Sequence, residues 1–392
     1  MKKNKFIVVV GDGMADYPVV ELGGRTPLEV ADKPNMDFIA SKGKVGIIET
    51  VPHGMAPDSA VANLRILGYN PRKYFTGRGP LEAGAMGIEL GPKDIAFRCN
   101  LITEGGGKLL DYSAGHVSTE EAAQLLEEVK KFGIGEFHVG VSYRHVLVLR
   151  NSDARAGCTP PHDIVGEPIS KHLIKPKDET SRKLNELMLA SKKVLSKHPV
   201  NLRRVELGKN PANMIWLWSP GGKPVLKRFK EKYGLSGAMI SAVNLIKGIG
   251  VYAGMEMIDV PGATGYYDTN YEGKADYALK ALESKDLVYV HVEAPDEAGH
   301  AGDAEQKIKT IEDLDKRLIG RILKGARDCK IAVLPDHPTP IKVRTHTPDP
   351  VPFAIYAPGA KGDGLRFDES SGKRGSLGFI PGEKFMELML AL

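Results

Sequence analysis

The stretch FIVVVGDG (residues 6–13) decides the fold, because a run of β-branched residues ends abruptly in Gly-Asp-Gly. Three further apolar runs end in a similar way, in Asp, His or Pro: VYVHVEAP (288–295), IAVLPDH (331–337) and PFAIYAP (352–358). Short continuous apolar runs are typical of strands buried on both faces, as in a parallel sheet covered by helices. We therefore expect a strand of one large sheet in each run.

Segments with helical periodicity lie between and beside these strands. They are residues 57–68, 118–131, 179–197, 236–248, 273–284 and 304–325. In the last segment Ile308, Ile311 and Leu314 recur near helical spacing, and we expect its charged residues on the opposite, solvent-facing side. Strands that alternate with helices predict a doubly wound α/β sheet.

The middle of the chain has a different character. It contains Gly-rich turns, one expected helix, and the strand-like pieces FHVGVSY (137–143) and HVLVLR (145–150), followed by Pro-rich stretches. This pattern predicts a small α+β domain at residues 104–178, inserted into a larger domain made of residues 1–103 and 179–392.

Composition narrows the class of protein. The chain has 392 residues, 42% of them hydrophobic, which is ample for a large core. Its 54 basic and 49 acidic residues leave a net charge of +5 with no basic stripe, so we expect no nucleic-acid partner. No apolar run approaches the roughly 18–20 residues of a membrane span. Three cysteines without a CxxC pair indicate neither a disulfide framework nor a zinc knuckle. We therefore expect a cytoplasmic enzyme by default. The oligomeric state stays open, because the apolar C-terminal segment could cover the sheet or contact another subunit.

Metal-ligand side chains gather at the expected strand ends, which is where open α/β sheets bind ligands. The residues are Asp12, Asp296, His300, Asp336, His337 and His346. Each one alone could belong to a turn or a capped helix. Together, mixed Asp and His ligands without cysteine suit Mn²⁺, Mg²⁺ or Zn²⁺. Six ligands are too many for one catalytic ion and enough for two, which clamp phosphoryl oxygens when they lie about 3.5–4 Å apart.

A serine at a helix start is the candidate nucleophile. In MAPDSAVANLRILGYNP (55–71) either Asp58 or Ser59 caps a helix. Ser59 could be a simple N-cap, or a nucleophile whose phosphorylated form is stabilised by the helix N-terminus. The absence of a GxSxG motif disfavours a serine esterase. The first strand end lacks the last glycine of GxGxxG and carries Asp12, which disfavours a dinucleotide site.

At this point the residues match a known family. GDGMAD (11–16), the 55–71 segment, APDEAGHAGD (294–303), PDHPTP (335–340) and RTHTPDPVPFAIY (344–356) resemble the archaeal-type cofactor-independent phosphoglycerate mutases of the alkaline phosphatase superfamily. The likeness runs nearly end to end. It implies an alkaline-phosphatase-like three-layer α/β/α sheet with a smaller inserted substrate-binding domain. It also implies interconversion of 3-phosphoglycerate and 2-phosphoglycerate in glycolysis and gluconeogenesis, through a phosphoserine, with two divalent metals and no 2,3-bisphosphoglycerate.

The resemblance also implies residue roles. Ser59 is the nucleophile, and Mn²⁺ is the expected ion, with Mg²⁺ or Zn²⁺ as alternatives. One metal is held by Asp12, Ser59, Asp336 and His337, and the other by Asp296, His300 and His346. Lys247 faces the phosphate, while the candidates for glycerate binding in the insert are His116, Arg144, His162 and Asp163. For Arg144, His162 and Asp163, a purely structural role is equally open, as a charged residue on a strand surface or as a cap in a loop. The stretch WLWSPGGK (216–223) lacks the arginine pair with which the bacterial form holds its substrate.

Two other functions remain open. One is another metal-dependent phosphatase or phosphomutase of the same superfamily, which would share the metal residues and differ in the insert. The other is a nucleotide-binding module on a Rossmann-like sheet, which would bind NAD or ATP and hold no divalent metal tightly.

Overall fold

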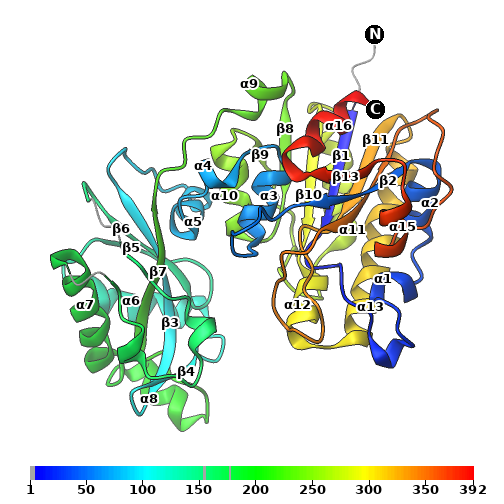
Figure 1. Ribbon diagram of the computed structural model, residues 1–392. Coiled ribbons are helices and arrows are strands. Elements are labelled where there is room, and N and C mark those ends of the chain that lie inside the picture. Colours follow the sequence, from blue (N-terminus) through cyan, green and yellow to red (C-terminus); the bar gives the residue numbers. More distant parts are fainter. Residues whose placement is uncertain (1–4, 153–155, 176–177) are drawn as a thin grey trace. The chain divides into compact units, whose positions relative to one another are not determined.

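The computed structural model describes residues 5–152, 156–175 and 178–392 (Figure 1). Their contacts divide the chain into two compact units, one of Met1–Phe75 with Val225–Leu392 and the other of Thr76–Pro224. The boundaries of the smaller unit thus lie at residues 76 and 224, and differ from the expected 104 and 178. The expected insertion lies wholly inside this unit, with its residues 153–155, 176 and 177 outside the described ranges.

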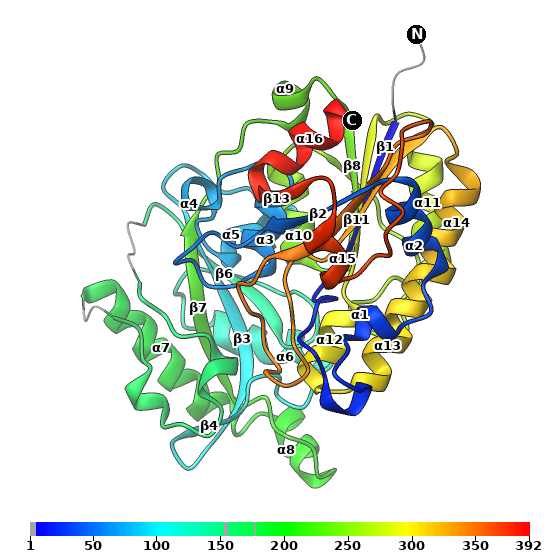
Figure 2. The ribbon, with the colours of Figure 1, turned by 45° about the vertical axis from the view of Figure 1, so that its right-hand side comes forward.

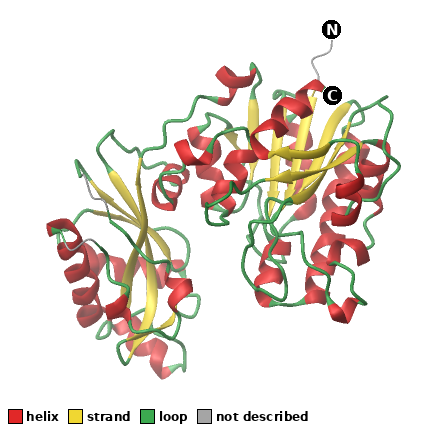
Figure 3. Cartoon of the chain, viewed as in Figure 1, coloured by secondary structure: helices red, strands yellow, loops and turns green. Residues whose placement is uncertain are grey.

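The larger unit is built on a sheet of eight described strands in the order β13-β2-β12-β11-β1-β10-β8-β9. Figure 3 draws the strands in yellow and the helices in red. Their bounds are β1 Lys5–Gly11, β2 Lys44–Glu49, β8 Gly237–Ile240, β9 Glu256–Met257, β10 Leu287–Val292, β11 Cys329–Leu334, β12 Val351–Tyr356 and β13 Gly378–Pro381. All four strands expected from the apolar runs are present. Strand β1 pairs parallel with β10 and with β11, which places the first apolar run at the centre of the sheet.

Strand direction decides which side chains can meet. The ends of β1, β10 and β11 lie at one edge of the sheet because these neighbours are parallel. Strand β12 runs antiparallel to β11 and to β2, so its start lies at that edge, and so does the end of β2. Residues after β1, β2, β10 and β11 and before β12 are therefore brought to the same edge.

Helices cover both faces of this sheet. The helices of the larger unit are α1 Pro27–Val30, α2 Pro34–Lys42, α3 Ser59–Ile66, α4 Pro71–Tyr74, α9 Phe229–Tyr233, α10 Asn244–Tyr252, α11 Tyr271–Ala281, α12 Ala294–Ala301, α13 Ala304–Asp313, η4 Leu314–Ile319, α14 Gly320–Gly325, α15 Glu369–Arg374 and α16 Phe385–Ala391, with short turns η1 Val20–Leu22 and η5 Gly382–Lys384. Figure 2 shows α2, α11 and α14 on one side of the sheet and α3, α10 and α16 on the other. The first side forms one apolar core with Ile7 and Val9 of β1. On the second side, Phe385 of α16 packs against Phe353 of β12. The predicted α/β class, a sheet between two helical layers, is confirmed.

One expected helix is wrong in part. Residues 236–248 were predicted as a single helix, but Gly237–Ile240 form the strand β8 and the helix α10 begins at Asn244. The tetrapeptide GAMI is short and apolar, and its pairing with β10 decides its conformation. Periodicity alone does not separate such a buried strand from a buried helix turn.

The smaller unit has an antiparallel sheet of five described strands. They are β3 Ile95–Gly105, β4 Lys108–Asp111, β5 Glu136–His138, β6 Arg144–Leu149 and β7 Met214–Gly222, accompanied by α5 Arg78–Ala85, α6 Thr119–Lys130, α7 Glu179–Leu195, α8 Pro199–Glu206, η2 Pro161–Ile164 and η3 Ile169–Lys171. The long pairing of β3 with β7 joins segments that are more than a hundred residues apart in the chain. This pairing explains why the unit extends beyond the expected boundaries at both ends.

Three further observations concern membrane spans, the C-terminal helix and the cysteines. Within the described ranges, the helices are all too short or too polar to cross a membrane. The C-terminal helix α16 buries Phe385, Met386 and Met389, so its apolar side is used within the larger unit. Cys99, Cys158 and Cys329 are free thiols.

Candidate active site

The expected ligand residues meet at one edge of the large sheet, as the strand directions require. Asp12 follows β1, and Asp336 and His337 follow β11. The helix α12, which follows β10, carries Asp296, and the loop before β12 carries His346. The cluster is buried: Asp336 and His337 have no exposed surface and Asp12 has 1%.

One group of ligand atoms comes from Asp12, Asp336 and His337. Their ligand atoms lie within 4.8 Å of one another. Nε2 of His337 is 3.4 Å from Oδ1 of Asp12. The Asp336 carboxylate is oriented by the amides of Gly13 and His337, which donate to its Oδ1 at 3.2 and 2.9 Å. These backbone bonds leave its other oxygen directed toward the cluster.

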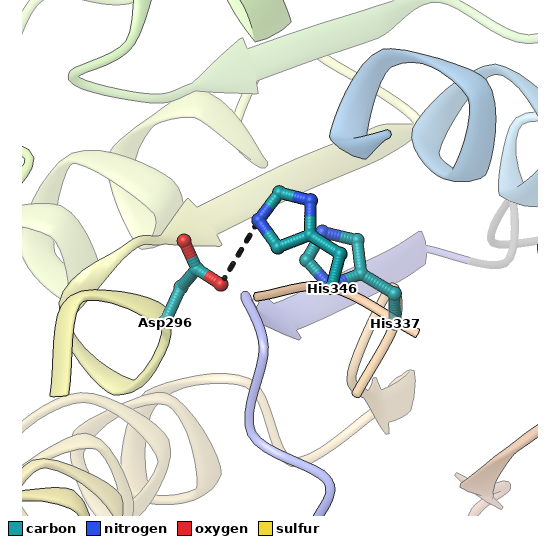
Figure 4. A group of neighbouring side chains, drawn as sticks. All are labelled: Asp296, His337 and His346. Atoms are coloured by element: carbon teal, nitrogen blue, oxygen red, sulfur yellow. Dashed lines mark ion pairs between the residues drawn. The ribbon is translucent and has the colours of Figure 1, made fainter. Parts of the chain in front are cut away.

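A second group is formed by Asp296, His337 and His346, whose ligand atoms also lie within 4.8 Å of one another. Figure 4 shows the rings of His337 and His346 one over the other, with centroids 3.9 Å apart, and the Asp296 carboxylate directed at His346. His300, one helical turn beyond Asp296, places Nε2 3.2 Å from Oδ2 of Asp296 and 3.0 Å from Nε2 of His346. His337 belongs to both groups, so the two candidate ion positions are adjacent.

The candidate nucleophile lies beside this cluster. Asp58 is the N-cap of α3, since its side chain accepts a hydrogen bond of 2.7 Å from the amide of Ala60. Ser59 is therefore not the cap, and its hydroxyl oxygen lies 3.1 Å from Nε2 of His337. Asn63 fixes the helix start to the cluster by donating to the carbonyl of Ser59 and to Oδ2 of Asp336, both at 2.8 Å.

The electrostatics of the cluster suit divalent cations. Burial, followed by the nearby carboxylates of Asp336 and Asp296, raises the pKa of Asp12 well above its usual range. Among the described residues, Oδ1 of Asp12 accepts no hydrogen bond although it is buried. Burial opposes ionisation of Asp296, but His346 and His300 lower its pKa well below the usual range. Buried carboxylates that crowd together call for a positive charge, and the oxygen and imidazole donors fit Mn²⁺, Mg²⁺ or Zn²⁺.

The histidines respond to the same carboxylates. Burial opposes protonation of His300, yet the hydrogen bond and charge of Asp296 raise its pKa to about 9. Burial lowers the pKa of His337 to about 4, which keeps its imidazole neutral and able to bind a metal.

Sequence reasoning missed His291, the next-to-last residue of β10. Its Nε2 is 3.2 Å from Oδ2 of Asp12 and 3.9 Å from Oδ2 of Asp336, and it has no exposed surface. With Asp12 and Glu293 it forms a third group of ligand atoms within 4.8 Å. A histidine inside an otherwise apolar strand was the available signal.

Lys247, the expected phosphate-facing residue, lies in α10. Its ammonium pairs with Asp259 at 2.5 Å, and its side chain is 22% exposed. Two of its three hydrogens could still donate to a phosphate while this ion pair is kept.

The four insert candidates gather in the smaller unit around a set of aromatic rings. His116 contacts the ring of Tyr143 with centroids 5.9 Å apart, and the guanidinium of Arg144 lies over the same ring at 4.8 Å. His162 contacts Trp218, with centroids 5.4 Å apart. Its neighbour Asp163 has a pKa raised by burial, which the charge of Arg78 opposes.

Two arginines of this cluster were not predicted. The guanidinium carbons of Arg78 and Arg98 lie 5.4 and 5.1 Å from the ring centroid of Trp218. Arg98 is buried and pairs with Glu82 at 2.7 Å. The stretch WLWSPGGK has no arginine of its own, but its Trp218 lies within reach of arginines supplied by α5 and β3.

Fold and site together define an α/β protein with a candidate two-metal centre beside a helix-start serine. The family profile described as 2,3-bisphosphoglycerate-independent phosphoglycerate mutase matches residues 40–201. Proteins named 2,3-bisphosphoglycerate-independent phosphoglycerate mutase are 54% identical in Methanothrix thermoacetophila, over 99% of this chain and 100% of the relative, and 54% identical in Methanosarcina acetivorans, over 98% and 99%. The chain belongs to this family, and it is an enzyme of the isomerase class.

Solved structures agree with this assignment. A protein from Pyrococcus horikoshii is 32% identical with a TM-score of 0.84, covering 100% of this chain and 97% of the other. A cofactor-independent phosphoglycerate mutase from Thermoplasma acidophilum is 30% identical with a TM-score of 0.65, covering 99% of both chains. The likeness therefore includes both compact units.

Proposed function

We propose that this protein interconverts 3-phosphoglycerate and 2-phosphoglycerate without 2,3-bisphosphoglycerate, through phosphorylation of Ser59. The observation that carries the proposal is the 3.1 Å contact of the Ser59 hydroxyl with His337 inside a buried carboxylate and imidazole cluster. A nucleophile held on the enzyme removes the need for a phosphorylated cofactor, since the phosphoryl group is stored on the serine between the two steps. The reaction belongs to glycolysis and gluconeogenesis.

The residues present fit two divalent ions, with Mn²⁺ expected. Asp12, Ser59, Asp336 and His337 would hold one ion, and Asp296, His300 and His346 would hold the other. When bound, the ions supply Lewis-acid activation of the serine hydroxyl and offset the charge on the phosphoryl oxygens. The two groups of ligand residues lie at the same edge of the large sheet. This placement supports a centre with two ions over a site for a single ion.

The first chemical step transfers the phosphoryl group to the protein. The hydroxyl oxygen of Ser59 attacks the phosphorus of 3-phosphoglycerate in line with the ester oxygen on carbon 3. The new oxygen–phosphorus bond to Ser59 forms as the ester bond breaks, and the serine proton ends on the released 3-hydroxyl of glycerate. The start of helix α3 favours the negative charge that Ser59 then carries.

The second step returns the group to the other hydroxyl. The 2-hydroxyl of glycerate attacks the phosphorus, the bond to Ser59 breaks, and Ser59 regains a proton as 2-phosphoglycerate forms. Glycerate must stay bound between the steps, because water that reached phospho-Ser59 would release inorganic phosphate. A group that binds the glycerate carboxylate firmly is therefore part of the mechanism.

We assign that binding role to the smaller unit. Arg78, Arg98 and Arg144 supply positive charge beside His116 and His162, and guanidinium groups match the geometry of carboxylates. Arg98 is oriented by its buried pair with Glu82, which keeps its guanidinium in a fixed position over Trp218. Lys247, paired with Asp259, remains the candidate for the phosphate.

The test is conversion of 3-phosphoglycerate to 2-phosphoglycerate by the purified protein with no 2,3-bisphosphoglycerate present. We expect activity with Mn²⁺, loss of activity in EDTA, recovery when Mn²⁺ is restored, and no activity in Ser59→Ala. Ser181→Ala is the matched control, since Ser181 is also buried in the first turn of a helix. Activity of Ser59→Ala at the wild-type level would contradict the nucleophile. Phosphate release without any 2-phosphoglycerate would instead favour a phosphatase of the same superfamily.

A further inference from the structure

Lys307 is a fully buried lysine on a helix whose charges were expected to face solvent. It lies in α13, with no exposed surface. Its ammonium donates to the carbonyl of Ala15 at 3.1 Å, to Oδ2 of Asp16 at 2.8 Å and to the carbonyl of Thr339 at 2.9 Å. A lysine ammonium has three hydrogens, so each of them has an acceptor.

The acceptors come from two separate loops. Ala15 and Asp16 belong to the loop after β1, and Thr339 belongs to the loop after β11. The same two loops bond directly, since the amide of Thr339 donates to the carbonyl of Ala15 at 3.3 Å and the amide of Ile341 to Oδ2 of Asp16 at 3.2 Å. Lys307 therefore lies at the junction of the loops that carry Asp12, Asp336 and His337.

Thr339 extends this junction to the second group of candidate ligands. Its hydroxyl donates a short hydrogen bond to Oδ1 of Asp296 and lies 3.3 Å from Nδ1 of His337. The carbonyl of the same residue is held by Lys307. One ammonium is thus connected to both candidate ion positions through a single residue.

A structural role alone does not require a charge at this position. Burial of a lysine is costly, and it lowers the pKa of Lys307 although Asp16 and Asp296 oppose the shift. A methionine has a similar volume and no charge to bury. Unlike Lys307, a methionine has no hydrogen-bond donor, so it would not hold two carbonyl oxygens and a carboxylate together. The site uses this property of Lys307.

We propose that Lys307 is a positioning residue that sets the spacing of the two ligand-bearing loops and so preorganises both ion positions. The inference rests on the two-metal site of the proposed function. Residues that orient metal ligands without touching the ion change metal affinity by about 10–100-fold when they are removed. Lys307→Met should therefore weaken Mn²⁺ binding by a factor in that range.

The experiment is calorimetric titration of the EDTA-treated, dialysed protein with Mn²⁺. It compares the wild type with Lys307→Met, with Lys307→Gln, which keeps a polar donor, and with Lys33→Met as control. Lys33 is an equally buried lysine that pairs with Asp37 at 2.9 Å and is not bonded to the two ligand-bearing loops. We expect weaker Mn²⁺ binding in both Lys307 variants, a smaller loss for Gln than for Met, and wild-type affinity in Lys33→Met. Activity of Lys307→Met should recover at high Mn²⁺ concentration.

Near-ultraviolet circular dichroism of each variant shows whether it is folded. Wild-type Mn²⁺ affinity in a folded Lys307→Met, or in a folded Lys307→Gln if the methionine variant does not fold, would overturn the inference. Asp16→Asn provides a third test, because it weakens the hydrogen bond of Lys307 to residue 16 and leaves the lysine in place. Unchanged Mn²⁺ affinity in this variant would also count against the proposal. A wild-type protein that binds no Mn²⁺ would instead overturn the two-metal site itself.

Discussion

The hydroxyl oxygen of Ser59 lies 3.1 Å from Nε2 of His337, a residue 278 positions further along the chain. Two features of the fold create this contact. The strands β2 and β11 end at the same edge of the sheet, and Asp58 caps α3 so that the Ser59 hydroxyl is left for the cluster. The following predictions test the consequences.

Loss of the cap should affect both stability and chemistry. In Asp58→Ala the amide of Ala60 loses its acceptor, which costs about 1 kcal/mol of unfolding free energy. The Ser59 hydroxyl would then be drawn toward the free amides at the helix start and away from His337. We therefore expect kcat to fall by more than the loss of folded protein would explain. Asp178→Ala, which removes the equivalent cap of α7, is the control and should lower stability with little change in kcat. Equal kcat in the two variants would contradict the role of Asp58.

Removal of one histidine from each proposed ligand set should cost one metal ion. His337 is assigned to the ion held with Asp12 and Asp336, whereas His300 lies beside Asp296 and His346 and is assigned to the other ion. We expect His337→Ala and His300→Ala each to retain one tightly bound Mn²⁺, as measured by plasma mass spectrometry after dialysis. Retention of two ions in either variant would refute the assignment of that histidine.

Metal binding should also stabilise the fold. Because the ions bind the native state, a free Mn²⁺ concentration 100 times the dissociation constant adds about 2.7 kcal/mol to the unfolding free energy. We therefore expect EDTA to lower the wild-type Tm and Mn²⁺ to raise it, while His337→Ala shows a smaller response. A Tm that is insensitive to both reagents would be inconsistent with the site.

The arginines around Trp218 should control substrate affinity. Arg78→Gln removes a guanidinium that lies 5.4 Å from the Trp218 ring centroid, so we expect KM for 3-phosphoglycerate to rise at least tenfold, roughly the loss of one charge-assisted hydrogen bond. The Mn²⁺ stoichiometry should not change. Titration with 3-phosphoglycerate should alter tryptophan fluorescence in the wild type and much less in the variant. Arg150→Gln, at a surface ion pair of the same unit, serves as control; an equal KM increase there would argue against a specific site.

Glu369 should make stability depend on pH near neutrality. Burial raises its pKa to about 7, although the hydroxyl of Thr26 and the amide of Asp16 favour the ionised form. The unfolded chain has a lower pKa for this group, so its stabilising contribution is complete below about pH 4.5 and is lost as pH rises through about 7, on the order of 3 kcal/mol.

Glu369→Gln keeps a neutral side chain at every pH. The difference in urea unfolding free energy between this variant and the wild type should therefore shift in favour of the variant from pH 5 to pH 8. Glu387→Gln, at an exposed ion pair, is the control and should show no such trend. A pH-independent difference for Glu369→Gln would refute the assignment.

The clustering of the candidate metal ligands was predictable because they lie near the ends of strands that are visible in the sequence. Asp12, Asp336 and His337 directly follow apolar runs that are visible in the sequence, and parallel strands bring their ends together without further information. Because β12 runs antiparallel to β11, the loop before β12 brings His346 to the same edge of the sheet.

The features that escaped prediction depend on long-range pairing. The strands β3 and β7 pair across more than a hundred residues, and this pairing fixes the extent of the smaller unit and brings Arg98 to Trp218. The helical pattern of 304–325 places its charged residues together on one side, but Lys307 is buried because two loops from other parts of the chain close over it. A single sequence contains no local signal for such contacts.

Transfer of the phosphoryl group through Ser59 is tested most directly by finding which residue carries that group during turnover. The Mn²⁺-loaded enzyme is mixed with 3-phosphoglycerate, quenched in acid within one turnover, digested and examined by mass spectrometry. We expect a phosphorylated peptide with the modification on Ser59, formed as fast as the reaction turns over and absent from Ser59→Ala. Two results would contradict a phosphoserine at position 59. One is a phosphate that forms and decays at the rate of turnover on another residue. The other is formation of 2-phosphoglycerate with no phosphorylated residue in the protein.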